Sequence, residues 1–350
     1  MKKKLNSTEI ARLAGVSRST VSRVVNHYSN VPDETRERVM KVIEEYEYYP
    51  SISGQVLAGK GTGTLGLIWV SRDRIAYDVQ ASSFFVHATE CAAELGYLML
   101  TCIVPNLQDA ENVDWVKRLF MQDRIDAGIF VGTNNYELLV EELLSRGKIV
   151  GLFDHYRAGP AELNRISVNF EAETGEKVID YVCRLGHRKI AVIDGNMNRY
   201  SSMQRHEGFI RGMQAHGVEI RREWMRYGDV TASGGYTAAK GLLQDCGDDL
   251  PTVICANNDS AAFGVYRALE EAGIPIPGQI SVVGIDGHEQ GKILSPPLTT
   301  FGFDFRQVFS SLVSRTVALV EKREDVPLTE FVPSRLIERG SCRPIQTKAD

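Results

Sequence analysis

The chain has 350 residues, of which 43% are hydrophobic and 24% are charged, and its formal net charge is −5 at pH 7. This length predicts two or three domains, and no apolar run of about 18 residues is present that could span a membrane. The six cysteines form no C-x-x-C pair, which argues against a disulfide framework or zinc site and is typical of a reducing cytoplasm. The start MKKKLNSTEIARL is basic without an apolar core after it, so we expect no secretory signal and a cytoplasmic location.

The charge is distributed unevenly. Residues 1–30 hold six lysines and arginines against one acid, a local charge of +5, so the other 320 residues sum to −10. A small basic head on a larger acidic body indicates a protein that touches nucleic acid with one end only.

The stretch Asn6–Asn26 predicts two short helices joined by a turn. Asn6 can cap the first helix and Glu9 can complete a capping box. Gly15 can take the left-handed conformation that ends this helix. Ser17 can then cap a second helix that extends to the end of the stretch.

The outward face of the second helix carries donors and positive charge. At helical spacing it presents Arg18, Ser19, Ser22, Arg23 and Asn26. Arginine can bind a guanine edge with both arms of its guanidinium and hydroxyls can reach phosphate or bases, so the helix suits the major groove of DNA. The alternative is an ordinary helical hairpin with a solvated basic face, because a helix-turn-helix spacing alone has false positives.

A third helix is predicted over Pro32–Tyr48, and the residue before Pro50 ends it. The three helices would make an all-α headpiece over residues 1–49, followed by a hinge and linker over 50–63. The segment SISGQVL in this linker is too short to hold a helix alone. It is either more linker or a segment that becomes helical only when two copies meet on DNA.

From Leu65 onward, short β-rich runs such as LGLIWV, KIAVID and ISVVGID alternate with helical stretches. This pattern is typical of parallel sheets with crossover helices. The strands are too many for one sheet of usual width, so two α/β lobes are predicted, from about residue 64 and from about residue 165.

Polar residues follow three of these strands. They are Asp154 after KIVGLF, Asn258 after TVICAN, and Asp286 after ISVVGI. Because open parallel sheets bind ligands at the carboxyl ends of their strands, we expect the three side chains to edge one cleft. Acids and an amide can pair with many hydroxyl groups, which a sugar offers.

The chain resembles the LacI/GalR family of bacterial transcription regulators, because it carries motifs typical of that family in a fixed order. The resemblance runs from TEIARLAGVSRSTVSRVVN through LGHRKIAVIDG and PTVICANNDSAAFGVYRALEEAGIPIPGQISVVGID to VPSRLIERGS. It implies a helix-turn-helix headpiece, a hinge, and an effector core of two Rossmann-like lobes with the periplasmic-binding-protein type I fold. We place the crossings between lobes near 164, 295 and 326. The N-lobe would then hold 64–163 and 295–325, the C-lobe 165–294 and 327–342, and 343–350 would form a tail.

The resemblance also implies roles for single residues. Arg18, Ser19 and Arg23 match positions that read bases. Ser17, Thr20 and Ser22 match positions near phosphates, and Leu57 matches a hinge leucine that wedges into the minor groove. Gly54 departs from the alanine usual in the family, so we expect this hinge helix to form less readily without DNA.

In the core, Asp154, Arg205, Asn258 and Asp286 match ligand contacts of the family, and Phe305 matches an aromatic that closes the pocket in sugar-responsive members. Val230 stands where several members have an aromatic that stacks on the ligand ring. This loss argues against a purine and favours a small sugar or sugar derivative.

Other residues are given structural roles. We expect Asp259 to cap the following helix and His187 to be a surface turn residue. We expect Phe84 and Phe85 to lie in the core or an interface, with the cleft mouth as the alternative, and Trp69 is equally ambiguous.

Three other classes of protein are alternatives to a sugar-responsive regulator. The chain lacks a G-x-S-x-G elbow, a phosphate-binding loop and an H-E-x-x-H spacing, so we expect no enzyme, no catalytic residue, no metal and no cofactor. A secreted sugar-binding protein without a DNA role conflicts with the basic head. A regulator that answers to a protein partner or a non-sugar metabolite stays open.

The sequence therefore predicts a cytoplasmic, sugar-responsive transcription regulator that acts as a repressor. Each headpiece reads one half-site, so we expect a homodimer on a near-palindromic operator. Only nine residues follow Ser341, too few for an additional tetramer-forming helix, so we expect no more than a dimer.

Overall fold

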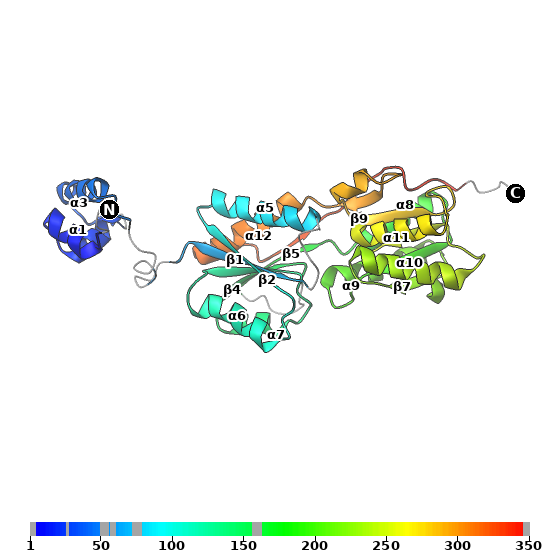
Figure 1. Cartoon of the computed structure of the whole chain (residues 1–350), viewed down its shortest axis with the longest axis horizontal. Coiled ribbons are helices and arrows are strands. Elements are labelled where there is room, and N and C mark those ends of the chain that lie inside the picture. The colour runs from blue at the N-terminus through cyan, green and yellow to red at the C-terminus, as the bar shows by residue number, and fades with distance from the viewer. Residues whose placement is uncertain are drawn as a thin grey trace. The chain divides into compact units, whose positions relative to one another are not determined.

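The computed structural model describes residues 5–25, 28–49, 56, 61–71, 79–155 and 163–345. The chain divides into two compact units, residues 1–62 and 63–350, and each is described by itself (Figure 1). None of the helices in the described ranges could cross a bilayer.

The first unit contains the three predicted helices, α1 (Ser7–Ala14), α2 (Arg18–Val25) and α3 (Asp33–Glu45). The capping box of α1 is confirmed, because Thr8 N and Glu9 N each donate to Asn6 Oδ1 at 3.0 Å and Asn6 N donates to Glu9 Oε2 at 2.9 Å. Gly15 ends α1 in the left-handed conformation, with φ of 64°. This turn reverses the chain so that α2 can pack back on α1.

A small apolar core holds the three helices together. Its fully buried members include Ile10, Val21, Val24 and Val39. The third helix is shorter than the predicted span of Pro32–Tyr48. Pro32 is its N-cap and gives no side-chain bond, and Glu47 has a positive φ of 49° that a continuing helix does not allow. The predictions for Asn26, Gly54 and Leu57 lie outside the described residues.

The second unit contains two six-stranded sheets. The strands of the first sheet, in spatial order, are β11 (Thr329–Val332), β5 (Arg165–Phe170), β4 (Ile149–Phe153), β3 (Ala127–Val131), β1 (Thr64–Val70) and β2 (Leu98–Val104). The strands of the second are β12 (Arg335–Ile337), β10 (Thr299–Gly302), β9 (Ser281–Asp286), β8 (Val253–Ala256), β6 (Ile190–Asp194) and β7 (Met225–Tyr227). All neighbouring pairs are parallel except β10 with β12.

Helices cover both faces of each sheet, as parallel strands require. The first sheet is covered by α5 (Val79–Glu94) and α12 (Phe305–Val320) on one face and by α6 (Ala110–Met121) and α7 (Leu138–Ser145) on the other (Figure 1). In the second lobe, α8 (Thr174–Arg184) packs with α9 (Tyr200–Ala215), and α10 (Ala232–Cys246) packs with α11 (Asp259–Glu271). Two short 3₁₀ helices, Arg222–Trp224 and Glu289–Lys292, complete it.

The two α/β lobes of the core agree with the predicted fold class, but the predicted crossings near 164, 295 and 326 come too early. Strand β5 belongs to the first sheet, where it pairs with β4, and β10 belongs to the second, where it pairs with β9. Strand β11 returns to the first sheet beside β5. The crossings therefore follow Phe170, Gly302 and Val332. The apolar pattern of a strand predicts burial and does not say which of two sheets receives it.

His187 is not the surface turn residue that was predicted. Its side chain is buried, and its ring bonds to Thr252 Oγ1 at 3.0 Å and to the carbonyl oxygen of Arg343 at 3.2 Å. Burial lowers the pKa of His187 to about 4, so the ring is neutral at physiological pH. It ties the end of the described chain to the second sheet.

The contact of α8 with α9 depends on glycine. A side chain at Gly175 would meet the carbonyl oxygen of Arg205 and would approach Phe209 N to 2.8 Å. Gly208 on the facing helix would meet Gly175 in the same way. This close approach of two backbones fixes the position of α9.

We predict that Gly175→Ala lowers the free energy of unfolding by ~1–3 kcal/mol, because overpacking must push α9 away from α8. Gly241→Ala is the matched control, since this helical glycine of α10 has nothing within 4 Å of its added Cβ. It should raise stability by about 0.5–1 kcal/mol. Urea unfolding of both variants measures the difference. Equal effects of the two substitutions would show that the α8–α9 contact tolerates an added methyl group.

Candidate functional site

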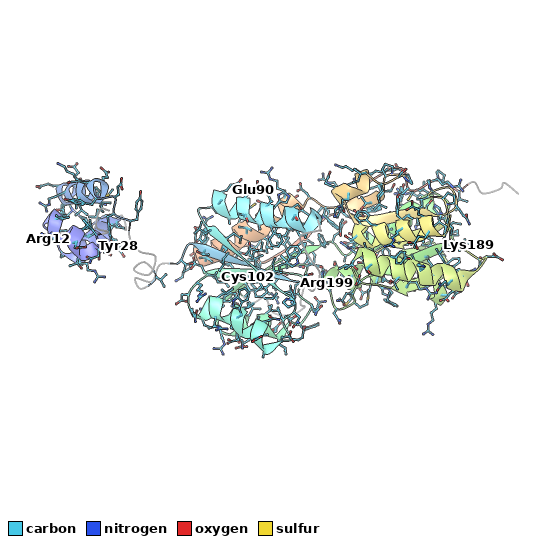
Figure 2. The ribbon with its side chains drawn as sticks, viewed as in Figure 1. Arg12, Tyr28, Glu90, Cys102, Lys189 and Arg199 are labelled. Atoms are coloured by element: carbon cyan, nitrogen blue, oxygen red, sulfur yellow. The ribbon has the colours of Figure 1, made fainter. Side chains whose placement is uncertain are left out.

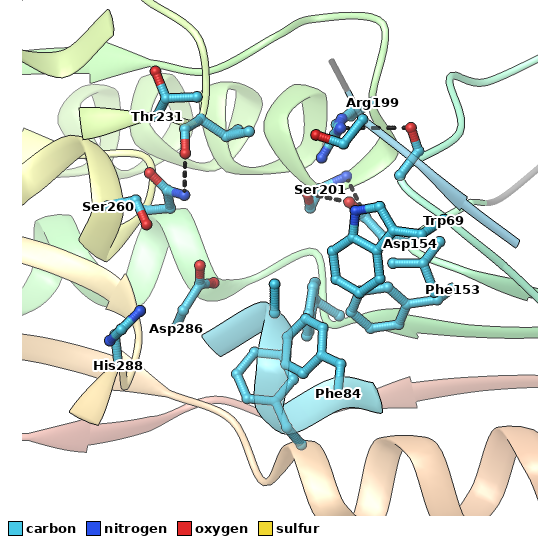
Figure 3. Close-up of a pocket in the computed structure, with 18 of the residues that line it drawn as sticks. Trp69, Phe84, Phe153, Asp154, Arg199, Ser201, Thr231, Ser260, Asp286 and His288 are labelled. Atoms are coloured by element: carbon cyan, nitrogen blue, oxygen red, sulfur yellow. Dashed lines mark hydrogen bonds between the residues drawn. The ribbon is translucent and has the colours of Figure 1, made fainter. Parts of the chain in front are cut away.

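A cavity of about 480 Å³ lies between the two lobes of the core. The carboxyl ends of β1, β3 and β4 border it from the first lobe, and the ends of β8 and β9 and the start of α9 border it from the second. All five residues of the predicted effector site line this one cavity: Asp154, Arg205, Asn258, Asp286 and Phe305. Figure 3 shows the cavity with Trp69, Phe84 and Phe153 on one side and Ser260, Asp286 and His288 on the opposite side.

Arg205 on α9 is the most buried charge of the site, with 4% of its surface exposed. One arm donates to Asp286 Oδ1 at 2.9 Å and the other donates to the carbonyl oxygen of Asn257 at 2.7 Å. The guanidinium also lies over the rings of Phe170 and Phe303, at 5.3 and 5.8 Å from their centroids. Its buried Nε has no hydrogen-bond partner among the described residues. Arg205 therefore holds Asp286 in place at the cavity wall.

Asp154 bridges the lobes. It follows β4 of the first lobe, and its carboxylate accepts from Ser201 N at 2.9 Å and from Ser201 Oγ at 2.7 Å at the start of α9 in the second lobe. A second bridge lies nearby, where Asn135 N donates to the carbonyl oxygen of Asn198 at 2.8 Å. Burial raises the pKa of Asp154, and the bond from Ser201 and the charge of Arg205 oppose this shift.

Asn258, and not Asp259, caps helix α11. Asn258 Oδ1 accepts from Ala261 N at 2.9 Å, and its amide donates to the carbonyl oxygen of Val230 at 2.9 Å. The carboxylate of Asp259 instead points into the second lobe, where it accepts from His288 N at 2.6 Å and from Thr300 Oγ1 at 2.7 Å. The predicted cap was wrong by one residue because both side chains are good caps and only the backbone conformation selects between them.

Backbone strain marks the same site. Asp154 has a φ of 56° and Asp286 has a φ of 119°, both on the left-handed side that side chains rarely adopt. Such conformations persist where the surrounding structure overrides them, and they gather at binding and active sites. Both acids are thus turned into the cavity at an energetic cost.

An aromatic wall faces these polar groups. Phe84 of α5 lies 4.5 Å from Phe305 and 5.7 Å from Phe153 between ring centroids, and Trp69 stacks on Phe85 at 4.9 Å. Trp69 and Phe84 belong to the buried core, as predicted for Phe84, and they also line the cavity. Sequence reasoning also missed Arg199, Ser201, Thr133 and His288, which line the cavity as well. No sequence signal marked these four residues, whereas Trp69 was marked by its position at the end of a strand.

The headpiece presents the predicted outward face. Ser17, Arg18, Ser19, Ser22 and Arg23 are exposed, and Thr20 is half-buried. Ser17 Oγ accepts from Thr20 N at 3.1 Å, which caps α2 as predicted. Within residues 5–25 and 28–49, neither Arg18 nor Arg23 forms an ion pair or a side-chain hydrogen bond. These two guanidinium groups are therefore available to an anionic partner.

A helix-turn-helix unit followed in one chain by a two-lobed, cleft-bearing core defines a ligand-controlled DNA-binding protein. Residues 8–51 match the family model "Bacterial regulatory proteins, lacI family", and residues 179–342 match the "Periplasmic binding protein-like domain". The chain is 30% identical over 342 residues to the HTH-type transcriptional repressor PurR of Pasteurella multocida (strain Pm70), with 95% of this chain and 97% of the relative covered. It is also 30% identical over 340 residues to the PurR of Erwinia tasmaniensis, with 95% of each covered.

Among solved structures, the Lac repressor dimer bound to operator and the anti-inducer ONPF aligns with a TM-score of 0.78 and 27% identity. The alignment covers 97% of this chain and 99% of that one. The chain belongs to the lacI family of bacterial regulatory proteins. It is a DNA-binding transcriptional repressor with an effector-binding core, and not an enzyme.

We predict that the buried carboxyl of Asp259 makes the stability of the core depend on pH. Burial and the nearby charge of Asp286 raise the pKa of Asp259 from its ordinary value of 3.8 to about 7. Between these two values the folded state binds more protons than the unfolded state, so stability falls as pH rises through this window, by at most about 4 kcal/mol for this group.

Thermal unfolding of Asp259→Asn between pH 4 and pH 8 tests this expectation. The amide removes the titration, so the stability of the variant relative to the parent chain should improve as pH rises. Asp248→Asn, at an exposed acid, should follow the parent at every pH. A constant difference between Asp259→Asn and the parent would show that Asp259 does not titrate in this window.

Proposed function

We propose that this repressor binds a near-palindromic operator as a homodimer, and that a sugar or sugar derivative in the cavity between the lobes controls its affinity for DNA. The observation that carries the proposal is the pairing, in one chain, of an unneutralised donor face on α2 with a cavity whose two walls differ in polarity. The first feature suits a nucleic acid and the second suits a polyhydroxylated ligand with an apolar face.

The donor face supports a division of labour on DNA. Arg18, Ser19 and Arg23 are assigned to base edges in the major groove, and Ser17, Thr20 and Ser22 to phosphates. Because Ser17 sits at the start of α2, its neighbourhood also has the partial positive charge of a helix N-terminus. Asn26 at the end of the stripe and Leu57 in the hinge complete the proposed interface, with Leu57 as the minor-groove wedge.

A surface on the first lobe supports self-association. Strand β2 is the edge of its sheet, and Leu98 and Ile103, on its opposite faces, are 68% and 54% exposed. Val86 on α5, which packs beside β2, is 53% exposed. Exposed apolar side chains in this number mark an association surface. A second copy placed there would bring two headpieces to two half-sites of one operator.

The walls of the cavity support a sugar. The aromatic faces of Trp69 and Phe84 can cover the C–H face of a pyranose ring, while Asn258, Arg205 and Asp286 can bind its hydroxyls. Val230 lines the cavity without offering a flat ring. Because Asp154 and Ser201 join the lobes across this cavity, a ligand that competes with or reinforces their contact would change the angle between the lobes. By linkage, the effector and the operator would then change each other's affinity by the same factor.

We predict that Arg23→Ala weakens operator binding by ~1–3 kcal/mol and relaxes the preference at one base pair in each half-site. Binding titrations on an operator and on its single-base variants measure both effects. Arg38→Ala is the control, because Arg38 is an exposed arginine on α3, outside the α2 face. It should change affinity equally on all sequences or not at all. An equal loss on every sequence for Arg23→Ala would assign Arg23 to phosphate.

A thermal-shift screen of neutral sugars, sugar acids, sugar phosphates and purine bases against the full chain tests the effector. A ligand at 100 times its dissociation constant stabilises the folded state by about 2.7 kcal/mol. We predict that a sugar or sugar derivative gives this shift and changes operator affinity. A shift with purines alone would replace the sugar by a purine, and no shift with any compound would favour a protein partner.

We further predict that Arg205→Lys removes the response to that ligand and leaves operator affinity within about twofold. Lysine keeps the charge but loses the fork that reaches both Asp286 and the Asn257 carbonyl. The measurement is operator binding with and without the ligand found in the screen. A variant that still responds at the same ligand concentration would remove Arg205 from the effector site.

A further inference from the structure

Five ionisable residues line the cavity: Asp154, Arg199, Arg205, Asp286 and His288. Four of them already have partners within the protein, and one of these, His288, accepts from Gln290 N through Nδ1 at 3.1 Å. Asp286 is paired with Arg205 at 2.9 Å, and both bonds to the Asp154 carboxylate come from Ser201. The cavity therefore contains two acids that already accept hydrogen bonds within the protein and one arginine that is paired with an acid, and Asp286 uses only Oδ1 in that pair.

Arg199 is the exception. Its backbone caps α9, and its guanidinium is half-buried at the cavity wall. The only hydrogen bond of this side chain among the described residues is a long one, from Nη2 to the carbonyl oxygen of Gly132 at 3.5 Å. No acid in the described ranges forms an ion pair with it. A guanidinium has five N–H groups, so most of its donor capacity stays unused.

Backbone hydrogen bonds hold the main chain of Arg199 at the start of α9, which places its side chain at the cavity wall. Arg199 N donates to the carbonyl oxygen of Asn196 at 2.9 Å, and Met203 N donates to the carbonyl oxygen of Arg199 at 3.2 Å. Across the cleft, Gly132 has a φ of +81° and leaves no room for a side chain beside the Val70 carbonyl. Figure 2 shows Arg199 where the two lobes approach each other, and Figure 3 shows it beside Ser201 at the end of the cavity.

The neighbours of this charge on the first lobe are hydroxyl groups. Ser71 follows Val70 at the end of β1, Thr133 follows Gly132 at the end of β3, and both line the cavity. Thr133 Oγ1 is held 3.3 Å from the ring Nδ1 of the buried His155. A cation on a cavity wall that also carries hydroxyl groups matches the donor sets that bind carboxylate and phosphate oxygens in proteins.

We propose that the effector of this repressor is an acidic sugar derivative whose carboxylate or phosphate binds Arg199. The charge of Asp154 lies near enough to attract Arg199, but no ion pair forms between them within the described residues, and a half-buried cation left in this way is costly in a cavity from which a ligand excludes water. A neutral sugar would leave this cost in place, whereas an anionic group would remove it and gain a charge-assisted contact. The inference rests on the proposed control by a sugar or sugar derivative and names the chemical class within it.

The test uses isothermal titration calorimetry of the full chain with matched ligands. One set is glucose, glucuronate and glucose 6-phosphate, and the other is galactose, galacturonate and galactose 6-phosphate. We expect one acid to bind at least about tenfold more tightly than its neutral parent. The carboxylate and phosphate arms distinguish the two anions that Arg199 could bind.

Arg199→Gln should lower the affinity for that acid about tenfold or more and leave the affinity for the neutral parent within about twofold. Arg199→Lys keeps a cation and should restore part of the loss. Arg222→Gln removes the same charge from an exposed position of the second lobe that does not line the cavity, and it should bind every ligand as the parent chain does. Circular dichroism spectra of the variants confirm that each is folded.

Two outcomes overturn the inference, and they differ from each other. Equal affinity for acid and neutral sugar, with an equal loss of both in Arg199→Gln, would leave the sugar-controlled repressor standing and make Arg199 a donor to hydroxyls. Failure of every sugar, neutral or acidic, to bind would remove the sugar effector itself and the anionic group with it.

Discussion

The close packing of α9 on α8 is the constraint on which the effector site depends. Two glycines, Gly175 and Gly208, let the backbones of these helices approach so closely that neither position accepts a side chain. Helix α9 carries Ser201 and Arg205, and its N-cap is Arg199. Its position relative to the second sheet therefore decides where the two cations of the cavity stand and where the bridge to Asp154 can form. A shift of even a methyl radius in this contact would move all three groups together, because close-packed interiors transmit displacement instead of absorbing it.

The site combines groups that would be unfavourable one by one. Burial raises the pKa of Asp154 and Asp286, and both hold left-handed backbone conformations. The charge of Arg205 and its hydrogen bond oppose the rise in the pKa of Asp286. The rings of Phe170 and Phe303 and the Asn257 carbonyl in turn hold the buried Arg205 guanidinium. Such mutual dependence is expected of buried ion pairs, where removal of one partner leaves the other charge uncompensated. The arrangement resists substitution, and so it defines a geometry that a ligand must match.

The sequence predicted the parts of this molecule that local chemistry determines. The capping box at Asn6 and Glu9, the left-handed Gly15 and the strand-end positions of Asp154, Asn258 and Asp286 each follow from residue type and spacing over a few positions. The lobe crossings did not, because the residues of β5, β10 and β11 do not say which sheet each strand joins, and only long-range pairing assigns them. Arg199 gave no signal for a related reason. An arginine before a helix is usually solvated. Arg199 is half-buried because the first lobe, which is distant in sequence, forms the facing wall of the cavity.

Two of the three crossings lie directly against the cavity, which suggests how a bound ligand reaches the rest of the chain. Phe170 ends β5 just before the first crossing, and Phe305 begins α12 shortly after the second; both rings line the cavity. Phe303, within the second crossing, packs against Phe170 with ring centroids 4.1 Å apart. A ligand that presses on this group of rings acts on the segments that join the lobes as well as on the lobes themselves. Helix α12 and strand β11 then return to the first lobe, where β11 joins the first sheet. That sheet also contains β1, the strand that follows the linker of the headpiece. A change in lobe angle would therefore act, through continuous chain, on the strand nearest in sequence to the DNA-binding unit. An effector can influence operator affinity only through differential contact with two lobe arrangements. Under the control proposed above, the rings at the crossings are where a ligand would contact the segments that join the lobes.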